Sequence, residues 1–309
     1  MNTLARVLAA VDFSRPSRNA FDFALALARS HRAELVAVHA VPLDETFDRH
    51  GKERLALKAD LRRLADAAQV PFAYRVQQGD PAEIVLLHAL SIDPDVIVVG
   101  SHQRSGLARL RVGSVSERIV TRTRMPVLVV PAGARPNPAG AFRHVAVAVG
   151  DPSGAAVERG LQVASEATER VTLLHAVPGY SSGVPPHLYR YGLVEYEGRQ
   201  LLDARRALKR AVPAERRSRA TIHTRILRGD TTTQLDRAVE TIGADVLVVG
   251  VPRRGIVANA LFGSTAARLL KMIDIPLLAV PVAGPRPRTV PAIERQTAAV
   301  RHAVLSRAM

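Results

Sequence analysis

Short apolar runs alternate with amphipathic stretches through the first half of the chain. Apolar runs bounded by polar residues predict buried strands at 7–11, 34–41, 96–99 and 127–130, and alternating apolar and polar residues predict another strand at 72–77. Apolar residues three and four positions apart predict helices at 20–30, 52–69, 81–90 and 114–122. Strands that alternate with helices in this way predict an α/β fold with a parallel sheet and right-handed crossovers.

The second half of the chain repeats the first. A constant offset of 150 holds from residue 79 to residue 131, where it matches Gly79-Asp80, Val98-Val99-Gly100 and Gly113-Ser114 with Gly229-Asp230, Val248-Val249-Gly250 and Gly263-Ser264. Earlier, Val38–Pro42 matches Leu174–Pro178 at an offset of 136, so the second copy carries an insertion of 14 residues. The segment 179–198, rich in Gly, Pro, Ser and Tyr, predicts a loop there.

This duplication predicts four parts of the chain. Repeat one covers residues 1–132, a Pro/Gly linker covers 133–141, and repeat two covers 142–282. A basic tail, 283–309, follows.

The start of the helix at 114–122 is a candidate ligand site. Ligands of open parallel sheets bind at the carboxyl ends of the strands, and Gly113-Ser114 follows the strand at 96–99. A glycine and a hydroxyl at the positive end of a helix dipole suit a phosphate. The alternative is that Ser114 or Ser116 only caps the helix.

Several motifs together resemble the universal stress protein family. They are Val11-Asp12-Phe13-Ser14 after the first strand, Gly79-Asp80-Pro81, Met125-Pro126-Val127, and the spacing Gly100-x₂-Gln103-x₉-Gly113-Ser114. The resemblance covers nearly all of repeat one and, more weakly, repeat two. It implies that each repeat is a five-stranded parallel sheet of order 3-2-1-4-5 with helices on both faces, an adenine nucleotide alpha-hydrolase-like fold. It also implies that the fifth strands, 127–130 and 277–280, pair the repeats into an internal pseudo-dimer, and that a homodimer can form.

The same resemblance implies an adenine-nucleotide site, because many members of the family bind ATP. Carried over residue by residue, Asp12 and Val41 would contact adenine and Gly100 would lie near the ribose. The backbone of Gly113, Ser114 and Val115, with the Ser116 hydroxyl, would hold the phosphates of ATP, with or without Mg²⁺. The matching positions of repeat two are Gly250, Arg253, Gly263, Ser264 and Thr265.

This chain departs from the family pattern at its middle glycine, which is Gln103 in repeat one and Arg253 in repeat two. The Gln103 side chain would enter the phosphate site, while Arg253 would either fill the pocket or pair with a phosphate. Repeat two also has Ala266 in place of Ser116, so we expect it to be the poorer binder. These departures leave a second hypothesis open, a structural or interaction module that has lost nucleotide binding.

The composition of the chain excludes several kinds of functional site. The chain has 309 residues and no Cys, which excludes disulfides, thiolate nucleophiles and Cys-type zinc sites. No apolar run approaches the ~20 residues of a membrane span, so we expect a cytoplasmic protein with no membrane partner.

The ten His residues include no pair at metal-ligand spacing. His39 and His175 lie at equivalent places in predicted strands, where we expect them to be structural residues with satisfied hydrogen bonds. With no triad order and no Walker lysine, we expect no enzyme, and only weak ATP hydrolysis stays open.

Most of the net charge of +15 lies in two segments of the chain. Segment 205–228 holds nine basic residues against Glu215 alone, and the tail is also basic. Either this segment is a solvated surface, or it is a patch for nucleic acid or another polyanion. With aromatic residues at only 4 % of the chain, no stacking platform for single-stranded nucleic acid is expected.

Overall fold

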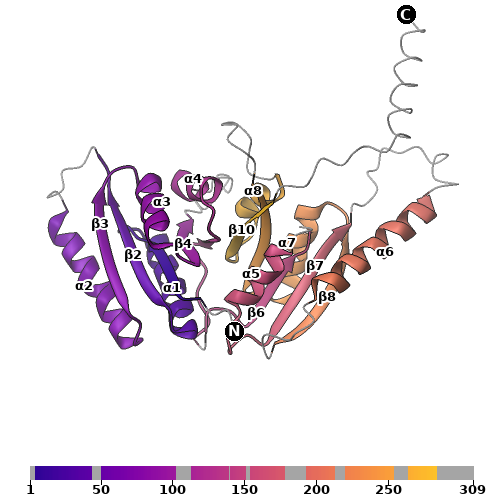
Figure 1. The fold of residues 1–309 in the computed structure, drawn as a ribbon, viewed down its shortest axis with the longest axis horizontal. Coiled ribbons are helices and arrows are strands. Elements are labelled where there is room, and N and C mark those ends of the chain that lie inside the picture. Colours follow the sequence, from indigo (N-terminus) through magenta and orange to yellow (C-terminus); the bar gives the residue numbers. More distant parts are fainter. Residues whose placement is uncertain are drawn as a thin grey trace, which may run out of the picture.

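Two copies of one strand-helix unit build the protein (Figure 1). The structure, a computed structural model, describes residues 4–43, 50–101, 113–138, 140–150, 154–177, 193–212, 220–253 and 264–283. The elements of repeat one are β1 Arg6–Ala10, α1 Arg15–His31, β2 Glu34–Val41, α2 Gly51–Ala67, β3 Phe72–Gln78, α3 Pro81–Ile92, β4 Val96–Ser101, α4 Ser114–Arg122 and β5 Val127–Pro131. Those of repeat two are β6 His144–Ala148, α5 Ala155–Val163, β7 Arg170–Val177, α6 Leu193–Ala211, β8 Thr221–Arg228, α7 Thr231–Ile242, β9 Val246–Arg253, α8 Ser264–Met272 and β10 Leu277–Ala283.

The strands form one ten-stranded sheet in the order β3-β2-β1-β4-β5-β10-β9-β6-β7-β8. Each half has the order 3-2-1-4-5 with parallel neighbours, which confirms the predicted fold class. The halves meet where β5 and β10 run antiparallel, with Leu128 opposite Leu278. The sheet is therefore continuous across both repeats.

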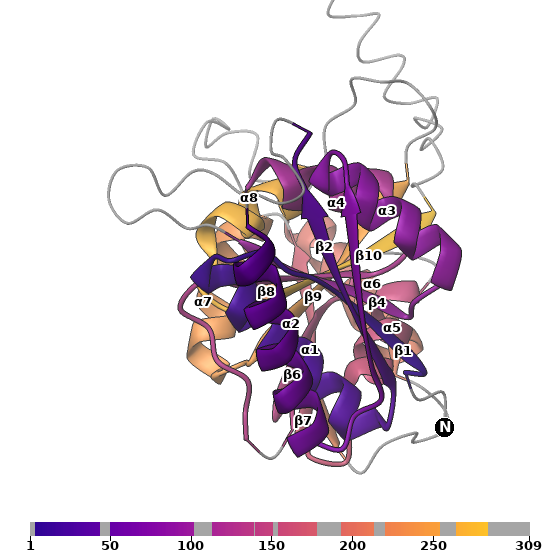
Figure 2. The ribbon, with the colours of Figure 1, turned by 90° about the vertical axis from the view of Figure 1, so that its left-hand side faces the viewer.

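Helices cover both faces of the sheet. Figure 2 looks at the molecule from the repeat-one end and shows α1 and α2 on one side of the strands and α3 and α4 on the other. One buried apolar cluster lies under α1, α2, α5 and α6, and a second lies under α3, α4, α7 and α8. Each cluster contains residues of both repeats, so the repeats share their core.

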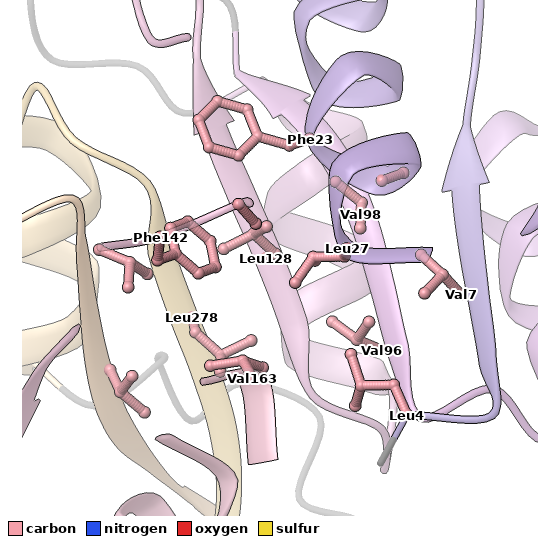
Figure 3. Close-up of a cluster of buried hydrophobic side chains, with 14 of the residues drawn as sticks. Leu4, Val7, Phe23, Leu27, Val96, Val98, Leu128, Phe142, Val163 and Leu278 are labelled. Atoms are coloured by element: carbon pink, nitrogen blue, oxygen red, sulfur yellow. The ribbon is translucent and has the colours of Figure 1, made fainter. Parts of the chain in front are cut away.

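The segment between the repeats is part of that core. Phe142, just before β6, stacks on Phe23 of α1 with ring centroids 5.8 Å apart (Figure 3). Both rings are about 1 % exposed. The Asn19 side chain of α1 also donates to the carbonyl of Ala132. These contacts fix α1 against the chain that leaves β5.

Two predicted boundaries at the starts of helices were wrong by more than two residues. Helix α1 begins at Arg15 instead of residue 20, because the Ser14 hydroxyl accepts from the Ser17 N–H and Pro16 in the first turn has no N–H that needs an acceptor. The predicted loop 179–198 ends too late, since α6 starts at Leu193; residues 179–192 lie outside the described part. Gly198 is tolerated within α6 because burial of Ala204 and Leu208 against the sheet outweighs the ~1 kcal/mol cost of a helical glycine.

Among the described residues, no helix is long and apolar enough to span a bilayer.

Candidate functional site

A cavity of about 410 Å³ lies at the carboxyl ends of the repeat-one strands. Its walls come from the ends of β1, β2 and β4 and the starts of α1, α3 and α4. The lining residues are Ala10, Val11, Asp12, Phe13, Ser14, Ser17, Val38, His39, Ala40, Pro42, His50, Pro81, Val85, Val99, Gly100, Gly113, Ser114, Val115 and Ser116.

Hydrogen bonds fix the turn between β1 and α1. The Asp12 N–H donates to Ser17 Oγ at 2.7 Å, and the Ser14 N–H donates to Asp12 Oδ1 at 2.8 Å. Asp12 itself is exposed at the mouth of the cavity. The turn therefore holds one carboxylate at a defined place beside the cavity.

The end of β4 is held between two helices. Ser116 Oγ of α4 donates to the Gly100 carbonyl at 2.8 Å, and Ser116 is only 4 % exposed. A Cβ on Gly100 would lie 2.6 Å from the Pro16 carbonyl oxygen at the start of α1. Glycine is needed here because the α1 backbone approaches so closely. The hydroxyl hydrogen of Ser116 is committed to the protein, which leaves only its lone pairs for a ligand.

The first turn of α4 faces the cavity without a side-chain cap. Gly113, which has no side chain, is the N-cap residue, and among the described residues no side-chain cap bonds the start of α4. The alternative that Ser114 or Ser116 caps the helix is therefore wrong. An uncapped helix start presents backbone N–H donors and the positive end of the dipole, which suit an anion.

An aromatic cluster that the sequence analysis missed lines the other side of the cavity. The Phe13 ring is 50 % exposed and lies 5.1 Å from the His39 ring and 5.9 Å from the His50 ring, between centroids. The signal in the sequence was an aromatic residue placed between Asp12 and Ser14, where a polar turn is expected. His50 carries no local signal, because only the fold brings it to the cavity.

His39 and His175 are structural residues, as predicted. His39 Nδ1 lies 2.9 Å from the Val11 carbonyl oxygen, and His175 Nδ1 bonds the Val149 carbonyl in repeat two. In each repeat the ring ties the second strand to the end of the first. Among the described residues, no group of three His, Asp or Glu could hold a metal ion.

The structure gathers six of the predicted site residues around the cavity: Asp12, Gly100, Gly113, Ser114, Val115 and Ser116. Val41 is not among the lining residues, because its side chain is 1 % exposed and its carbonyl accepts from the Gly79 N–H at 2.8 Å. Gln103 and Gly263 lie outside the described residues, as do the side chains of Arg253 and Ser264.

Repeat two keeps part of the framework at its equivalent strand ends. Gly250 lies in β9 and Thr265 in α8. Ala266 is 3 % exposed where repeat one has Ser116, so the hydroxyl link between the fourth helix and the fourth strand is missing.

An ion pair joins α3 to α4 beside the cavity. Asp80 caps α3 by accepting from the N–H groups of Ala82 and Glu83, and its other oxygen lies 2.7 Å from Arg118 Nη1 of α4. Repeat two has the same link at 3.2 Å, between Asp230 and Arg268. The hydrogen bond from Arg118 is the main cause that holds the pKa of Asp80 below its usual value.

We expect Asp80→Asn to weaken the fold near neutral pH and not at acidic pH. A lowered folded-state pKa gives stability that is present above the unfolded Asp pKa of about 3.9 and is lost as the pH falls through the folded-state pKa. Because Asn still caps the helix and the pair is solvent-exposed, the loss in unfolding free energy should be about 0.2–1 kcal/mol. Urea unfolding at several pH values measures this loss. In an Arg118→Gln background the effect of Asp80→Asn should shrink; an unchanged effect would assign the stabilisation to the negative charge of Asp80 at the N-terminus of α3 and not to its pair with Arg118.

Comparisons with known proteins agree with this architecture. The family model described as the Universal stress protein family matches residues 3–131 and 141–281. The chain is 31 % identical over 144 residues to Universal stress protein YxiE of Bacillus subtilis, which covers 40 % of this chain and 97 % of that protein. It is 34 % identical over 133 residues to a universal stress protein of Thermus aquaticus, covering 40 % of this chain and 96 % of that one.

Solved structures share the tandem arrangement. A universal stress protein from Archaeoglobus fulgidus superposes with a TM-score of 0.66 at 17 % identity, over 89 % of this chain and 98 % of that one. A protein of unknown function from Pseudomonas aeruginosa, PA1789, gives 0.64 at 15 % identity, over 91 % and 94 % of the two chains. At these identities the likeness concerns the fold. With both halves matched by the family model, the chain belongs to the universal stress protein family and carries two copies of its unit in tandem.

Proposed function

We propose that repeat one binds an adenine nucleotide, ATP, in the cavity between β1, β4 and α4, and that the protein acts as a nucleotide-binding or nucleotide-sensing component of a stress response. The observation that carries the proposal is the uncapped start of α4, with Gly113 and Ser114, opening onto a cavity at the carboxyl ends of the strands. Its volume of about 410 Å³ is in the range of small-molecule sites.

The two sides of the cavity suit the two ends of a nucleotide. The α4 side offers backbone N–H groups and the Ser114 hydroxyl to phosphates. The opposite side is mostly apolar, with Val38, Ala40, Pro42 and the Phe13 ring available to a base. A nucleotide would therefore lie with its phosphates at α4 and its base toward β2.

The lining favours binding over turnover. Its described ionisable residues are Asp12, His39 and His50, and the His39 ring is held by the Val11 carbonyl. A hydrolase would need a base positioned on a water beside the terminal phosphate. We therefore propose a non-enzymatic role, with repeat two, which lacks the Ser116 hydroxyl, as the weaker or non-binding partner.

We also propose that the pairing of β5 with β10 makes the two repeats an internal pseudo-dimer in solution. The shared buried clusters and the stacking of Phe142 on Phe23 support this arrangement.

Calorimetric titration of the full chain with Mg²⁺-ATP tests the nucleotide proposal. We expect one site per chain, and we expect Gly113→Val to abolish the heat, because a branched side chain at the N-cap would enter the phosphate end. Gly133→Val is the matched control, since a Cβ at Gly133 meets no atom within 4 Å and the residue lies in the linker. No heat at millimolar ATP would overturn the proposal and favour a module that has lost nucleotide binding.

A further inference from the structure

The two outer edges of the sheet are built from equivalent elements but differ in charge. β3 with α2 closes one end of the sheet and β8 with α6 closes the other (Figure 1). Because the two edges derive from one duplicated unit, repeat one serves as an internal reference for repeat two. Aligned positions that carry different residues show how the two edges have diverged in charge.

The two outer helices can be aligned residue by residue. The segment Asp60-Leu61-Arg62-Arg63 of α2 matches Asp203-Ala204-Arg205-Arg206 of α6 at an offset of 143. Seven of the 14 inserted residues therefore precede this match and seven follow it, so the insertion does not lie wholly within 179–198 as predicted. The alignment keeps the buried positions, with Leu61 and Ala204 each about 1 % exposed. It also keeps an ion pair, from Arg63 to Asp60 in α2 and from Arg206 to Asp203 in α6.

The aligned positions show a change to positive charge on the repeat-two edge. Asp66 of α2 becomes Lys209, the neutral Ala67 becomes Arg210, and Gln78 at the end of β3 becomes Arg228 at the end of β8. The pair of Arg62 with Asp66, 3.9 Å between Nη1 and Oδ1, is thereby replaced by two like charges, Arg205 and Lys209, at the same spacing. We call Arg205, Lys209, Arg210 and Arg228 the basic edge.

The basic edge is exposed and lacks acidic partners. All four side chains are solvent-exposed, and within the described part of the chain none of them forms an ion pair. Like charges four residues apart destabilise a helix by about 0.2–0.5 kcal/mol per pair. The helix dipole favours Lys209 and Arg210 in the last turn of α6, but it does not extend to Arg228 on the strand. A bound anion would relieve the repulsion between Arg205 and Lys209.

We propose that the basic edge binds the phosphate backbone of duplex nucleic acid without reading its sequence. Three of its four residues are Arg, whose guanidinium matches phosphate oxygens in bidentate geometry. The protein has no Trp, and the His223 imidazole is the only ring on α6 from Gly198 onward or on β8, so this edge offers no platform of aromatic rings on which unpaired bases could stack. The edge belongs to repeat two, away from the repeat-one cavity, so this binding is independent of the proposed nucleotide function.

Fluorescence anisotropy of the full chain with a labelled mixed-sequence DNA duplex tests the proposal. With about four phosphate contacts, the affinity should fall about 100-fold between 50 and 200 mM salt. The quadruple variant R205Q/K209Q/R210Q/R228Q should bind at least about tenfold more weakly at low salt and lose most of the salt dependence. A variant of equal charge change on the other edge, K52Q/K58Q/R62Q/R75Q, should bind within about threefold of the unchanged protein.

Three results would overturn the proposal. Equal weakening in both quadruple variants would assign binding to net charge instead of the basic edge. Absence of duplex binding at low salt, with tight binding of an acidic peptide, would assign the edge to a protein partner. Displacement of the duplex by inorganic polyphosphate at a lower phosphate concentration than by unlabelled duplex would assign it to polyphosphate. Circular dichroism of each variant shows whether its fold is retained.

Discussion

Replacing Phe142 by Ala is expected to lower the free energy of unfolding by about 3–5 kcal/mol, the usual loss when a buried Phe is truncated. Phe142 is 1 % exposed and stacks on Phe23 of the other repeat, within a cluster that runs under both halves (Figure 3). Truncation would leave a cavity where α1 packs on the chain entering repeat two. Urea unfolding followed by circular dichroism measures the loss.

The same experiment tests whether the repeats unfold together. Because the core is shared, the unchanged protein should show one cooperative transition for both repeats. Leu202→Ala is the control, since Leu202 of α6 is 51 % exposed and its truncation should change the unfolding free energy by less than about 0.5 kcal/mol. Two separate transitions in the unchanged protein would contradict the shared core.

Gly100→Ala should destabilise the protein by about 1–3 kcal/mol and weaken nucleotide binding. The added Cβ would lie 2.6 and 2.7 Å from the carbonyl oxygen and carbon of Pro16 and 2.9 Å from the Ser17 nitrogen. These are backbone atoms, which cannot rotate away, so the start of α1 must move. That movement would displace Asp12, Ser14 and Ser17 from the cavity wall.

Gly51→Ala is the matched control for Gly100→Ala. A Cβ at Gly51 meets no atom within 4 Å, and its helical position should make Ala neutral or stabilising by about 0.4–1 kcal/mol. Denaturant unfolding and ATP titration of both variants give the comparison. If Gly100→Ala were as stable as Gly51→Ala, the close packing of α1 on β4 would be wrong.

The sequence predicted the elements where local pattern and burial coincide. The strand at 34–41 and the helix at 114–122 were predicted with the bounds that the structure shows. A run of residues buried on both faces defines β2, and Gly113 marks the start of α4. Repeat counting predicted the duplicated sheet, because residues 79–131 match without a gap.

Other features depend on contacts between distant segments, which no local pattern encodes. His50 reaches the cavity only because α2, which it precedes, packs against β3, and Phe13 contacts it across the turn. The need for glycine at position 100 comes from the approach of Pro16, more than 80 residues earlier in the chain. Val41 was expected at the cavity, but its place in the strand buries the side chain away from the lining.

The meeting of β5 and β10 within a single polypeptide has a consequence for how this protein responds to its own abundance. Two separate chains that pair through an edge strand come apart on dilution, whereas tethered partners keep a high local concentration. The pairing of the two repeats should therefore not depend on the concentration of the protein. In a symmetric homodimer every substitution occurs in both subunits, whereas two tethered repeats can change independently. One half can then keep a ligand cavity while the other changes its outer edge.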